Sequence, residues 1–474
     1  MNDITAFFAF LKYCLGYKEN MSRVIAGMNW HELYSFASKQ ALLGLCFEGI
    51  ERLGEEYPEE LKQNPIGREL LMTWMGKAQQ IRRQNMKVNA VASKLFSMLR
   101  EDGLRCCVLK GQGNALMYPN PYSRTPGDID VWIDASRERI MGYAQKKFEL
   151  GDDIRLQHLE TSLDGVPVEL HFFPCSMNNP IYHARLQKWF RRNADLQCSH
   201  IVGLPDGAGD IAVPTMAFNV IYQLTHLYHH FFDEGVGMRQ IIDYFLVGND
   251  FSKNVFLNND LSNHPVNFSN HPVPLSKEGS TFSPSPSSMV FTPPSVPPFP
   301  GDRNLRSGDV TAPSRCSEPL RSKDGGPSKV SPDCAGWDRL AIEGDNSAGS
   351  TTVVTSSAST ALVVVQKELK YLGLWKFAGA VMYVLHKALG LSEEKMIAPM
   401  DKKRGKLLLA EILNGGNFGR HFTKYGHFTQ QGMAKKYFLK IWRNMHFVRY
   451  FPAEALSEPI FRTWHFFWRL KHRR

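Results

Sequence analysis

The sequence predicts an α+β fold, in which a small mixed β-sheet core is flanked by N-terminal and C-terminal helical regions, with a disordered insertion. Three observations favour this class. Apolar residues recur at helical spacing over residues 1–100 and again from about residue 363. Short apolar runs bounded by turn residues, typical of strands, fill residues 101–213. Residues 251–362 keep neither period.

The N-terminal helical region comprises residues 1–100. Trp30–Leu53 has apolar residues at helical spacing, and Gly67–Leu99 is a long amphipathic pattern that Gly103 ends. These patterns predict helices that lead into the first strand of the sheet.

The core, residues 101–213, begins with an apolar strand at Cys106–Leu109. A Lys-Gly-Gln-Gly turn then leads into a short helix around Asn114–Tyr118. Arg137–Phe148 is predicted to be a helix packed across the sheet. Asp164-Gly165, between two strand-like runs, predicts a hairpin.

One strand of this core carries Asp128 and Asp130. Side chains two residues apart on a strand project from the same face, so the two carboxylates point one way, and Ile129, Val131 and Ile133 point towards a core. Adjacent carboxylates repel each other unless a cation lies between them. The pattern therefore indicates a divalent metal bound to phosphates; the alternative is a solvated acidic edge.

A second acidic strand lies in the run Gly165–Phe173. Its alternation places Glu169 and His171 on one face. If this strand pairs beside the Asp130 strand, Glu169 completes a cluster of three carboxylates. Such a cluster holds two metal ions roughly 3.5–4 Å apart, which clamp the attacking and leaving oxygens of a phosphoryl displacement.

Phosphate-binding residues are predicted just upstream of the acidic strand. Gly111 and Gly113 let backbone N–H groups approach phosphate. Lys110 and Arg124 supply positive charge to neutralise it. These four residues are the expected triphosphate contacts.

The lysine-glycine turn, tyrosine-proline turn, arginine, Gly-Asp-Ile-Asp run (127–130) and later acidic strand together resemble the polymerase-beta-like nucleotidyltransferase superfamily. The chain is most similar to a bacterial family of uncharacterised nucleotidyltransferases, over residues 1 to about 250 and again from about 366. The resemblance implies that Asp128 and Asp130 are the metal-binding pair and Glu169 the third acidic ligand, with Mg²⁺ or Mn²⁺ as cofactor. Lys110-Gly111 stands where the superfamily usually has glycine-serine, although lysine-glycine is usual in the closer family.

Residues 214–250 are predicted to be helical and contain several polar side chains of interest. His226 and His230, four residues apart, could hold a metal, but a packed or hydrogen-bonded pair is the simpler interpretation. Arg239 and Asp243 have the same spacing and could pair on one helix face. In the resembled family this segment forms part of the site wall, which implies that Arg239 and Asp243 contact nucleotide or acceptor.

The predicted insertion, residues 251–362, is rich in proline and serine. Residues 251–350 alone hold 14 of the 27 prolines. Such a segment cannot bury enough apolar surface to offset the loss of chain entropy. Its role is left open between partner binding, regulation and a neutral insertion.

The C-terminal helical region, residues 363–474, is basic. Residues 366–474 carry a net charge of +14, whereas the remainder of the chain carries −4. A solvated helix face explains this charge; nucleic acid, an acidic partner and an anionic membrane surface are alternatives. Gly415 and Gly416 are expected to cap a helix rather than bind phosphate.

The eight cysteines show no metal-binding or disulfide-type spacing, and no apolar run is long enough to span a membrane. The N-terminal apolar run lacks the basic flank and cleavage site of a signal peptide. These features favour a cytoplasmic location; they say nothing about the oligomeric state.

The leading hypothesis is a Mg²⁺-dependent nucleotidyltransferase that moves a nucleoside monophosphate from a nucleoside triphosphate to an unidentified hydroxyl acceptor. The alternative is a non-catalytic binding protein on the same fold, such as the neutralising partner of a two-gene module. RNA handling is a weaker idea, since no recognised nucleic-acid module accompanies the basic charge.

Overall fold

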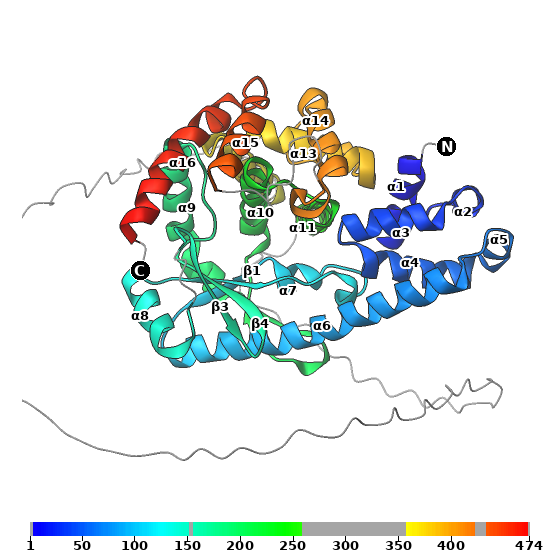
Figure 1. Cartoon of the computed structure of the whole chain (residues 1–474), viewed down its shortest axis with the longest axis horizontal. Helices are drawn as coiled ribbons and strands as arrows, with labels where there is room; N and C mark the ends of the chain where they lie inside the picture. The colour runs from blue at the N-terminus through cyan, green and yellow to red at the C-terminus, as the bar shows by residue number, and fades with distance from the viewer. Residues whose placement is uncertain (1–2, 151–154, 258–356, 422–432, 473–474) are drawn as a thin grey trace, which may run out of the picture. The chain divides into compact units, whose positions relative to one another are not determined.

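The computed structural model describes residues 3–150, 155–257, 357–421 and 433–472. The predicted α+β class is confirmed, with many helices around one small mixed sheet (Figure 1). Most of the predicted insertion lies outside the described residues. Its two ends, however, are helical, because α11 continues to Leu257 and α12 begins at Ser357.

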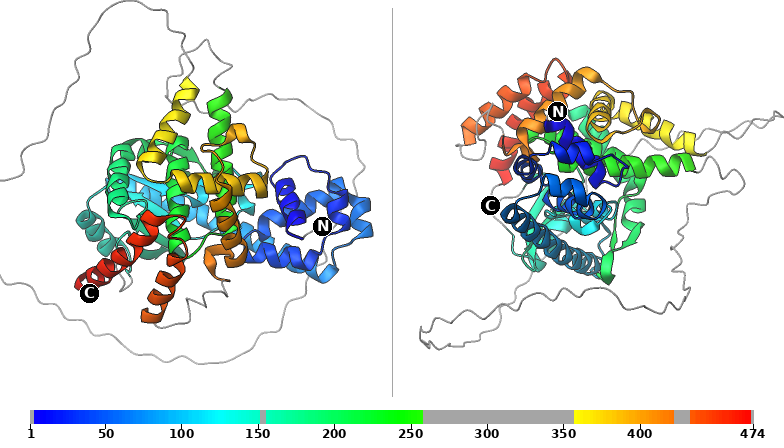
Figure 2. Two further views of the ribbon diagram at one scale, coloured as in Figure 1. Left: turned by 90° about the horizontal axis from the view of Figure 1, so that it is seen from above. Right: turned by 90° about the vertical axis from the view of Figure 1, so that its right-hand side faces the viewer.

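The N-terminal region is helical, as predicted. Its short helices gather around one end of the long helix α6 (Figure 2). Asn29 begins one of them in the usual way, since its side-chain oxygen accepts a hydrogen bond from the Glu32 N–H. The helices are α1 (Asp3–Cys14), α2 (Ser22–Ala26), α3 (Trp30–Lys39), α4 (Leu43–Glu56), α5 (Pro58–Gln63) and α6 (Arg68–Glu101).

The main sheet has four strands in the order β1-β2-β4-β3, with β2 and β4 parallel and the other pairs antiparallel. The predicted hairpin joins β3 to β4 through Asp164 (φ 49°) and Gly165 (φ 71°), the two positive φ angles of a type I′ turn. The elements of this core are β1 (Cys106–Leu109), α7 (Gly111–Ala115), η1 (Pro121–Ser123), β2 (Ile129–Ile133), α8 (Arg137–Lys147), β3 (His158–Leu163) and β4 (Val166–His171).

The two faces of this sheet have different partners. Val131, Leu170 and other alternate residues pack with α6 and α8 in one apolar cluster. On the opposite face Trp132 stacks on Phe218 of α10, with ring centroids 6.2 Å apart. Asp130 and Glu169 alternate with the first set, so they lie on the face that looks towards α10.

The predicted short helix is displaced relative to its expected position. It begins at Gly111, inside the Lys-Gly-Gln-Gly run, and ends at Ala115, before Tyr118. Side-chain hydrogen bonds fasten it on both sides: Gln112 donates to Asn89 of α6, and Asn114 exchanges two amide hydrogen bonds with Gln223 of α10. The turn at Lys110 is therefore held firmly between two long helices.

The remaining elements complete the helical part. Gly416 (φ 63°) caps α14, as predicted. The remaining elements are α9 (Pro180–Ser199), β5 (Ile201–Gly203), η2 (Pro205–Gly207), β6 (Asp210–Ala212), α10 (Met216–Asp233), α11 (Met238–Leu257), α12 (Ser357–Tyr371), α13 (Trp375–Leu389), η3 (Glu393–Lys395), α14 (Lys402–Gly415), η4 (Asn417–Gly419), α15 (Met433–Met445) and α16 (Pro452–His472).

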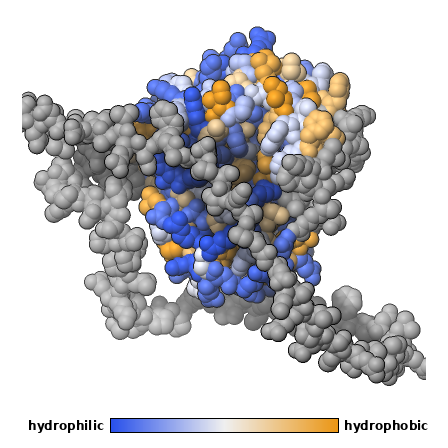
Figure 3. All heavy atoms as spheres, turned by 90° about the vertical axis from the view of Figure 1, so that its left-hand side faces the viewer, coloured by the Kyte–Doolittle hydropathy of each residue, from blue (hydrophilic) through white to orange (hydrophobic). Residues whose placement is uncertain are grey.

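The C-terminal helices pack onto the chain's own helical region. Phe447 stacks on Phe231 with ring centroids 4.6 Å apart, and Lys440 and Arg462 both pair with Asp233. Their outer side keeps exposed apolar residues, among them Ile460, and Figure 3 shows such residues near the top of one face. No helix among the described residues is long and apolar enough to cross a membrane.

The contact between α4 and η1 positions the segment that leads to Arg124, and Gly44 makes this contact close. A Cβ at Gly44 would overlap the Ser123 carbonyl oxygen, whereas a Cβ at Gly54 of the same helix would meet nothing. We expect Gly44→Ala to lower the free energy of unfolding by about 1–3 kcal/mol. Gly54→Ala, the matched control, is expected to raise it by up to about 1 kcal/mol. Urea unfolding of both variants measures this, and equal effects would contradict the packing argument.

Candidate active site on the α10 face of the β2–β4 pair

The parallel pairing of β2 with β4 brings the acidic residues together. In the strand register, Asp130 lies opposite Glu169. Asp128 comes just before β2, is exposed, and lies close enough for its charge to interact with both. The sequence predicted that these three residues would cluster if the strands of Asp130 and Glu169 paired. These strands, β2 and β4, do pair.

His171 lies between the two strands' carboxylates and was not assigned a role from the sequence. Its Nε2–H donates to Asp130 Oδ1 at 3.0 Å and to Glu169 Oε2 at 3.2 Å. Burial lowers the pKa of His171, but these two hydrogen bonds outweigh burial and raise the pKa to about 9. An imidazolium therefore compensates two buried negative charges at neutral pH.

The same contacts also shift the pKa values of the carboxylates. Burial raises the pKa of Asp130, but Lys110 and His171 outweigh it and hold that pKa well below its usual range. For Glu169, burial likewise raises the pKa, but the hydrogen bond and charge of His171 and the charge of His158 together outweigh burial and lower the pKa. Asp128 behaves differently: the charge of Asp130, and secondly the protein atoms crowded around the carboxylate, raise its pKa to about 6 although the residue keeps contact with solvent.

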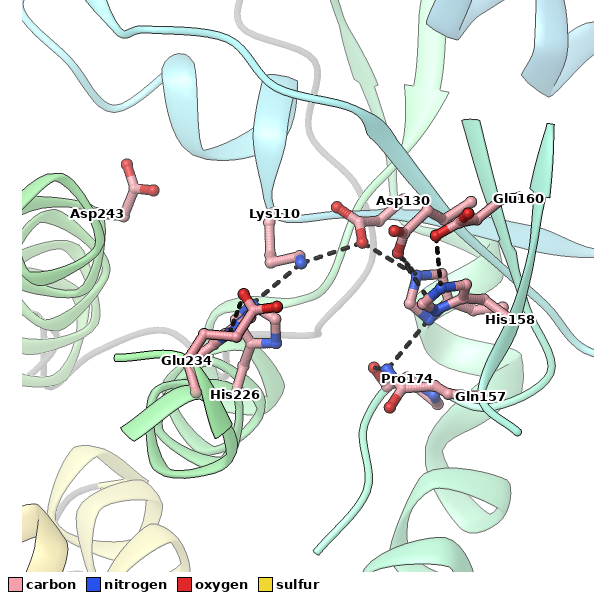
Figure 4. A network of polar contacts seen from close by, with 12 residues as sticks. Lys110, Asp130, Gln157, His158, Glu160, Pro174, His226, Glu234 and Asp243 are labelled. Atoms are coloured by element: carbon pink, nitrogen blue, oxygen red, sulfur yellow. Dashed lines mark hydrogen bonds and ion pairs between the residues drawn. The ribbon is translucent and has the colours of Figure 1, made fainter. Parts of the chain in front are cut away.

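Lys110 connects the acidic cluster to α10. Its ammonium lies 3.0 Å from Asp130 Oδ1 and donates to His226 Nε2 at 3.1 Å (Figure 4). The backbone there has φ 53° and ψ −133°, a conformation that a side chain with a Cβ rarely adopts. Strain of this kind, held in place by α6 and α10, indicates a functional position.

Beyond Lys110, α10 contributes the two histidines noted in the sequence. Nε2 of His230 lies 2.9 Å from Nε2 of His226, so the two rings form a hydrogen-bonded pair. Burial and then the Lys110 charge hold the pKa of His226 well below its usual range, and the ring is neutral. The two histidines thus lie as the hydrogen-bonded pair that the sequence favoured.

A pocket opens at this place, with an empty volume of about 500 Å³ that includes its mouth. Its lining combines residues predicted from the sequence with others that were not. The lining residues are Lys110, Gly111, Arg124, Gly127, Asp128, Asp130, Gln223, His226, Leu227, Arg239, Gln240, Asp243 and Phe418.

Arg124 and Asp243 form a buried ion pair in the pocket wall. Nε and Nη2 of Arg124 each donate to an Asp243 oxygen at 2.8 Å, and the Tyr118 hydroxyl donates to the same carboxylate. The suggested helix-face pair between Arg239 and Asp243 is therefore replaced by this longer-range pair. The remaining Arg124 nitrogen, Nη1, is buried without a hydrogen-bond partner in the described part of the chain.

Arg239 lies on another part of the wall. Its Nη1 donates to the Thr125 carbonyl at 3.1 Å, and its guanidinium carbon is 5.5 Å from the centroid of the Phe418 ring. Its Nε, like Arg124 Nη1, has no hydrogen-bond partner within the described ranges. Two guanidinium groups thus keep donor capacity at one pocket.

The two glycines of the turn have different surroundings. Gly111 (φ 42°) lines the pocket, as the prediction of a phosphate contact requires. Gly113 is not among the lining residues; a Cβ there would lie 2.9 Å from Val213 Cγ1. The structure therefore accounts for Gly113 by the close packing of α7 against Val213.

Several lining residues carried no usable signal in the sequence. Gln223 and Gln240 resemble ordinary polar residues of amphipathic helices. Phe418 follows the glycine-rich turn after α14, more than 170 residues from Gln240, and only the fold brings the two together. His171 could have been found from its alternation with Glu169 on β4.

We expect His171→Asn to destabilise the metal-free protein in a pH-dependent way. The folded-state pKa of about 9 exceeds the usual value, so the protonated ring contributes stability fully below about pH 6.5 and loses it as pH rises through 9. The penalty should be about 2–4 kcal/mol at pH 6 and clearly smaller at pH 9.5. Urea unfolding in EDTA measures it, with His200→Asn as the control, because the His200 ring bonds a backbone carbonyl. Parallel pH profiles for the two variants would contradict the assignment.

Comparison with known proteins identifies a family for this chain. A family model described as "Uncharacterised nucleotidyltransferase" matches residues 26–262, which is half of the chain. No curated protein matches. A solved structure, an antigenic nucleotidyltransferase-like protein from Paracoccidioides brasiliensis, is 17% identical over 34% of this chain and 75% of its own, with a TM-score of 0.24, and this weak likeness carries no argument. On the family match, the chain belongs to the uncharacterised nucleotidyltransferases.

Proposed function

We propose that the protein is a polymerase-beta-like nucleotidyltransferase that transfers a nucleoside monophosphate from a nucleoside triphosphate to a hydroxyl acceptor. One observation carries the proposal: Asp130 and Glu169 are register partners on parallel strands, and Asp128, Lys110 and Arg124 surround the same pocket. Carboxylates and cations at one pocket suit a metal-bound triphosphate.

The donor set fits Mg²⁺ or Mn²⁺. Asp128, Asp130 and Glu169 offer carboxylate oxygens, the ligands that these hard cations prefer. The raised pKa of Asp128, caused first by the charge of Asp130, indicates negative charge that Lys110 and His171 leave uncompensated at this edge. We assign the three carboxylates to metal binding; the bound ions would neutralise charge on the reacting phosphate.

The chain's own residues would orient the triphosphate. Lys110 and Gly111 line the acidic end of the pocket, and Arg124 and Arg239 line it further along. Arg124 Nη1 and Arg239 Nε are buried donors without a protein partner among the described residues, and phosphate oxygens are suitable acceptors for both. Asp243 holds Arg124 by two hydrogen bonds, so we assign it to positioning rather than to contact with phosphate.

In the proposed reaction, the acceptor hydroxyl oxygen forms a bond to the α-phosphorus while the bond to pyrophosphate breaks, and the hydroxyl proton passes to the site's carboxylates. The low pKa of Glu169 makes that residue a weak base. We therefore assign Glu169 to holding a metal ion next to the nucleophile, and leave proton removal to the Asp128 oxygen that does not bind the metal.

We expect Asp128→Asn and Asp130→Asn each to lower the transfer rate by at least about 100-fold. Purified protein is incubated with each labelled nucleoside triphosphate, Mg²⁺ and a cell extract that supplies acceptors, and both labelled product and pyrophosphate are measured. Asp164→Asn is the matched control, because this carboxylate lies on the β3–β4 turn and pairs with Lys94.

The proposal fails if wild-type protein transfers no nucleotide from any of the four triphosphates, or if both site variants transfer as fast as Asp164→Asn. In the first outcome, nucleotide binding measured without acceptor separates an inactive binding protein from one that does not recognise nucleotide. Addition of excess EDTA should abolish transfer by wild type.

A further inference from the structure

Next to the carboxylates lie two histidines, His158 and His171, to which the proposed reaction gives no part. His158 of β3 and His171 of β4 are register partners, and Glu169 lies two residues from His171 on the same face. One ligand atom from each of these three residues lies within 4.8 Å of the others. Asp130 approaches the same cluster through His171.

No hydrogen bond within the described residues accounts for the burial of the His158 ring. Its side chain is buried, with 9% exposure, and neither ring nitrogen has a hydrogen-bond partner among the described residues. Its Nδ1 lies 3.3 Å from Glu169 Oε2, and its Nε2 lies 3.8 Å from Glu160. Buried polar atoms in proteins are nearly always bonded, so this ring is available to a ligand that enters the cluster.

The spacing of the donors matches a coordination sphere. Metal–ligand distances of about 2.0–2.2 Å place neighbouring ligand atoms of a tetrahedral site about 3.3–3.6 Å apart. Glu169 Oε2 lies 3.3 Å from His158 Nδ1 and 3.2 Å from His171 Nε2. His171 Nε2 in turn lies 3.0 Å from Asp130 Oδ1.

The local charge of the cluster also suits a divalent cation. Asp128, Asp130 and Glu169 carry three negative charges, and Lys110 carries one positive charge at 3.0 Å from Asp130. With both imidazoles neutral, the remaining charge of minus two equals that of one divalent cation.

We propose that His158, Glu169 and His171 form a site for a divalent transition-metal ion such as Zn²⁺ or Co²⁺, with Asp130 beside it. Imidazole nitrogens favour these ions over Mg²⁺. Binding replaces the Nε2 proton of His171, which leaves to solvent, by the metal. The site shares Glu169 with the proposed function, and so deepens it by giving one metal position a nitrogen-containing ligand set; binding itself requires no transfer.

The test is metal binding to the full chain after removal of metal with a chelator. Zn²⁺ and Co²⁺ are titrated by calorimetry, and the Zn²⁺ content after dialysis is measured by mass spectrometry. We expect one tightly bound ion per chain, proton release on binding, and an intense visible Co²⁺ spectrum of the kind that nitrogen ligands in a tetrahedral site produce. His158→Gln and His171→Gln should each weaken Zn²⁺ binding at least 100-fold.

The matched control is His183→Gln, which removes a partly buried histidine that packs on Phe173 outside the cluster. It should bind Zn²⁺ as wild type does. Wild type that binds no Zn²⁺, or His158→Gln that binds it unchanged, would overturn the inference. If the cluster variants fail to fold, the Co²⁺ spectrum of wild type decides: a weak spectrum typical of six oxygen ligands also overturns it.

Failure of this inference and failure of the proposed function give different results. Mg²⁺-supported transfer that depends on Asp128, without Zn²⁺ binding, leaves the enzyme and removes the histidine site. Zn²⁺ binding that depends on His158, without transfer by any nucleoside triphosphate, leaves the metal site and removes the proposed reaction.

Discussion

The structure of the site depends on two carboxylates that the fold forces to be neighbours. Parallel pairing of β2 and β4 places Asp130 beside Glu169 on a largely buried sheet face, where mutual repulsion is weakly screened. The chain offsets this repulsion with His171 and Lys110, both within 3.2 Å of a carboxylate oxygen. Several features position these two cations. They are the strained turn at Lys110, the hydrogen bonds that hold α7 between α6 and α10, and the neutral His226 ring, which accepts the second Lys110 hydrogen bond.

A second buried pair fixes the opposite wall of the pocket. Arg124 follows η1, and Asp243 lies on α11, 119 residues later, so their two hydrogen bonds tie the sheet core to the helical region. Loss of Asp243 would leave a buried guanidinium without its counter-charge, which is costly. The pair therefore has a structural role that is independent of any ligand. It also leaves one Arg124 nitrogen directed to neither a carboxylate nor a backbone oxygen of the described chain. Under the proposed function, stability and ligand recognition would thus use different atoms of the same side chain.

Local patterns were enough to predict much of this arrangement. Strand alternation separated Asp130 and Glu169 from Val131 and Leu170, and the Asp164-Gly165 pair identified the hairpin, because both signals depend only on neighbours in the chain. Contacts between distant segments were not predictable in the same way. The interpretation of Arg239 and Asp243 as helix neighbours overlooked Arg124, and Phe418 reaches the pocket from beyond the predicted insertion. The role of His171 was missed for a different reason: alternation gives its face, but its partners depend on the register between β2 and β4.

The protonated His171 also explains how one cluster can be stable both without and with a metal ion. In the metal-free protein the Nε2 proton lies between Asp130 and Glu169 and supplies the positive charge that their proximity requires. A cation that enters the cluster supplies the same charge, so the proton becomes redundant and leaves; metal affinity should then rise with pH until the ring is already neutral. Mg²⁺ gains little from an imidazole ligand, whereas Zn²⁺ and Co²⁺ gain more, so competition with this one proton would discriminate among metals. At the proposed site, His158, which has no proton-mediated contact to lose, would contribute to metal binding alone. The difference between the two histidines is thus the physical basis for separating the structural role of the cluster from its capacity to bind metal.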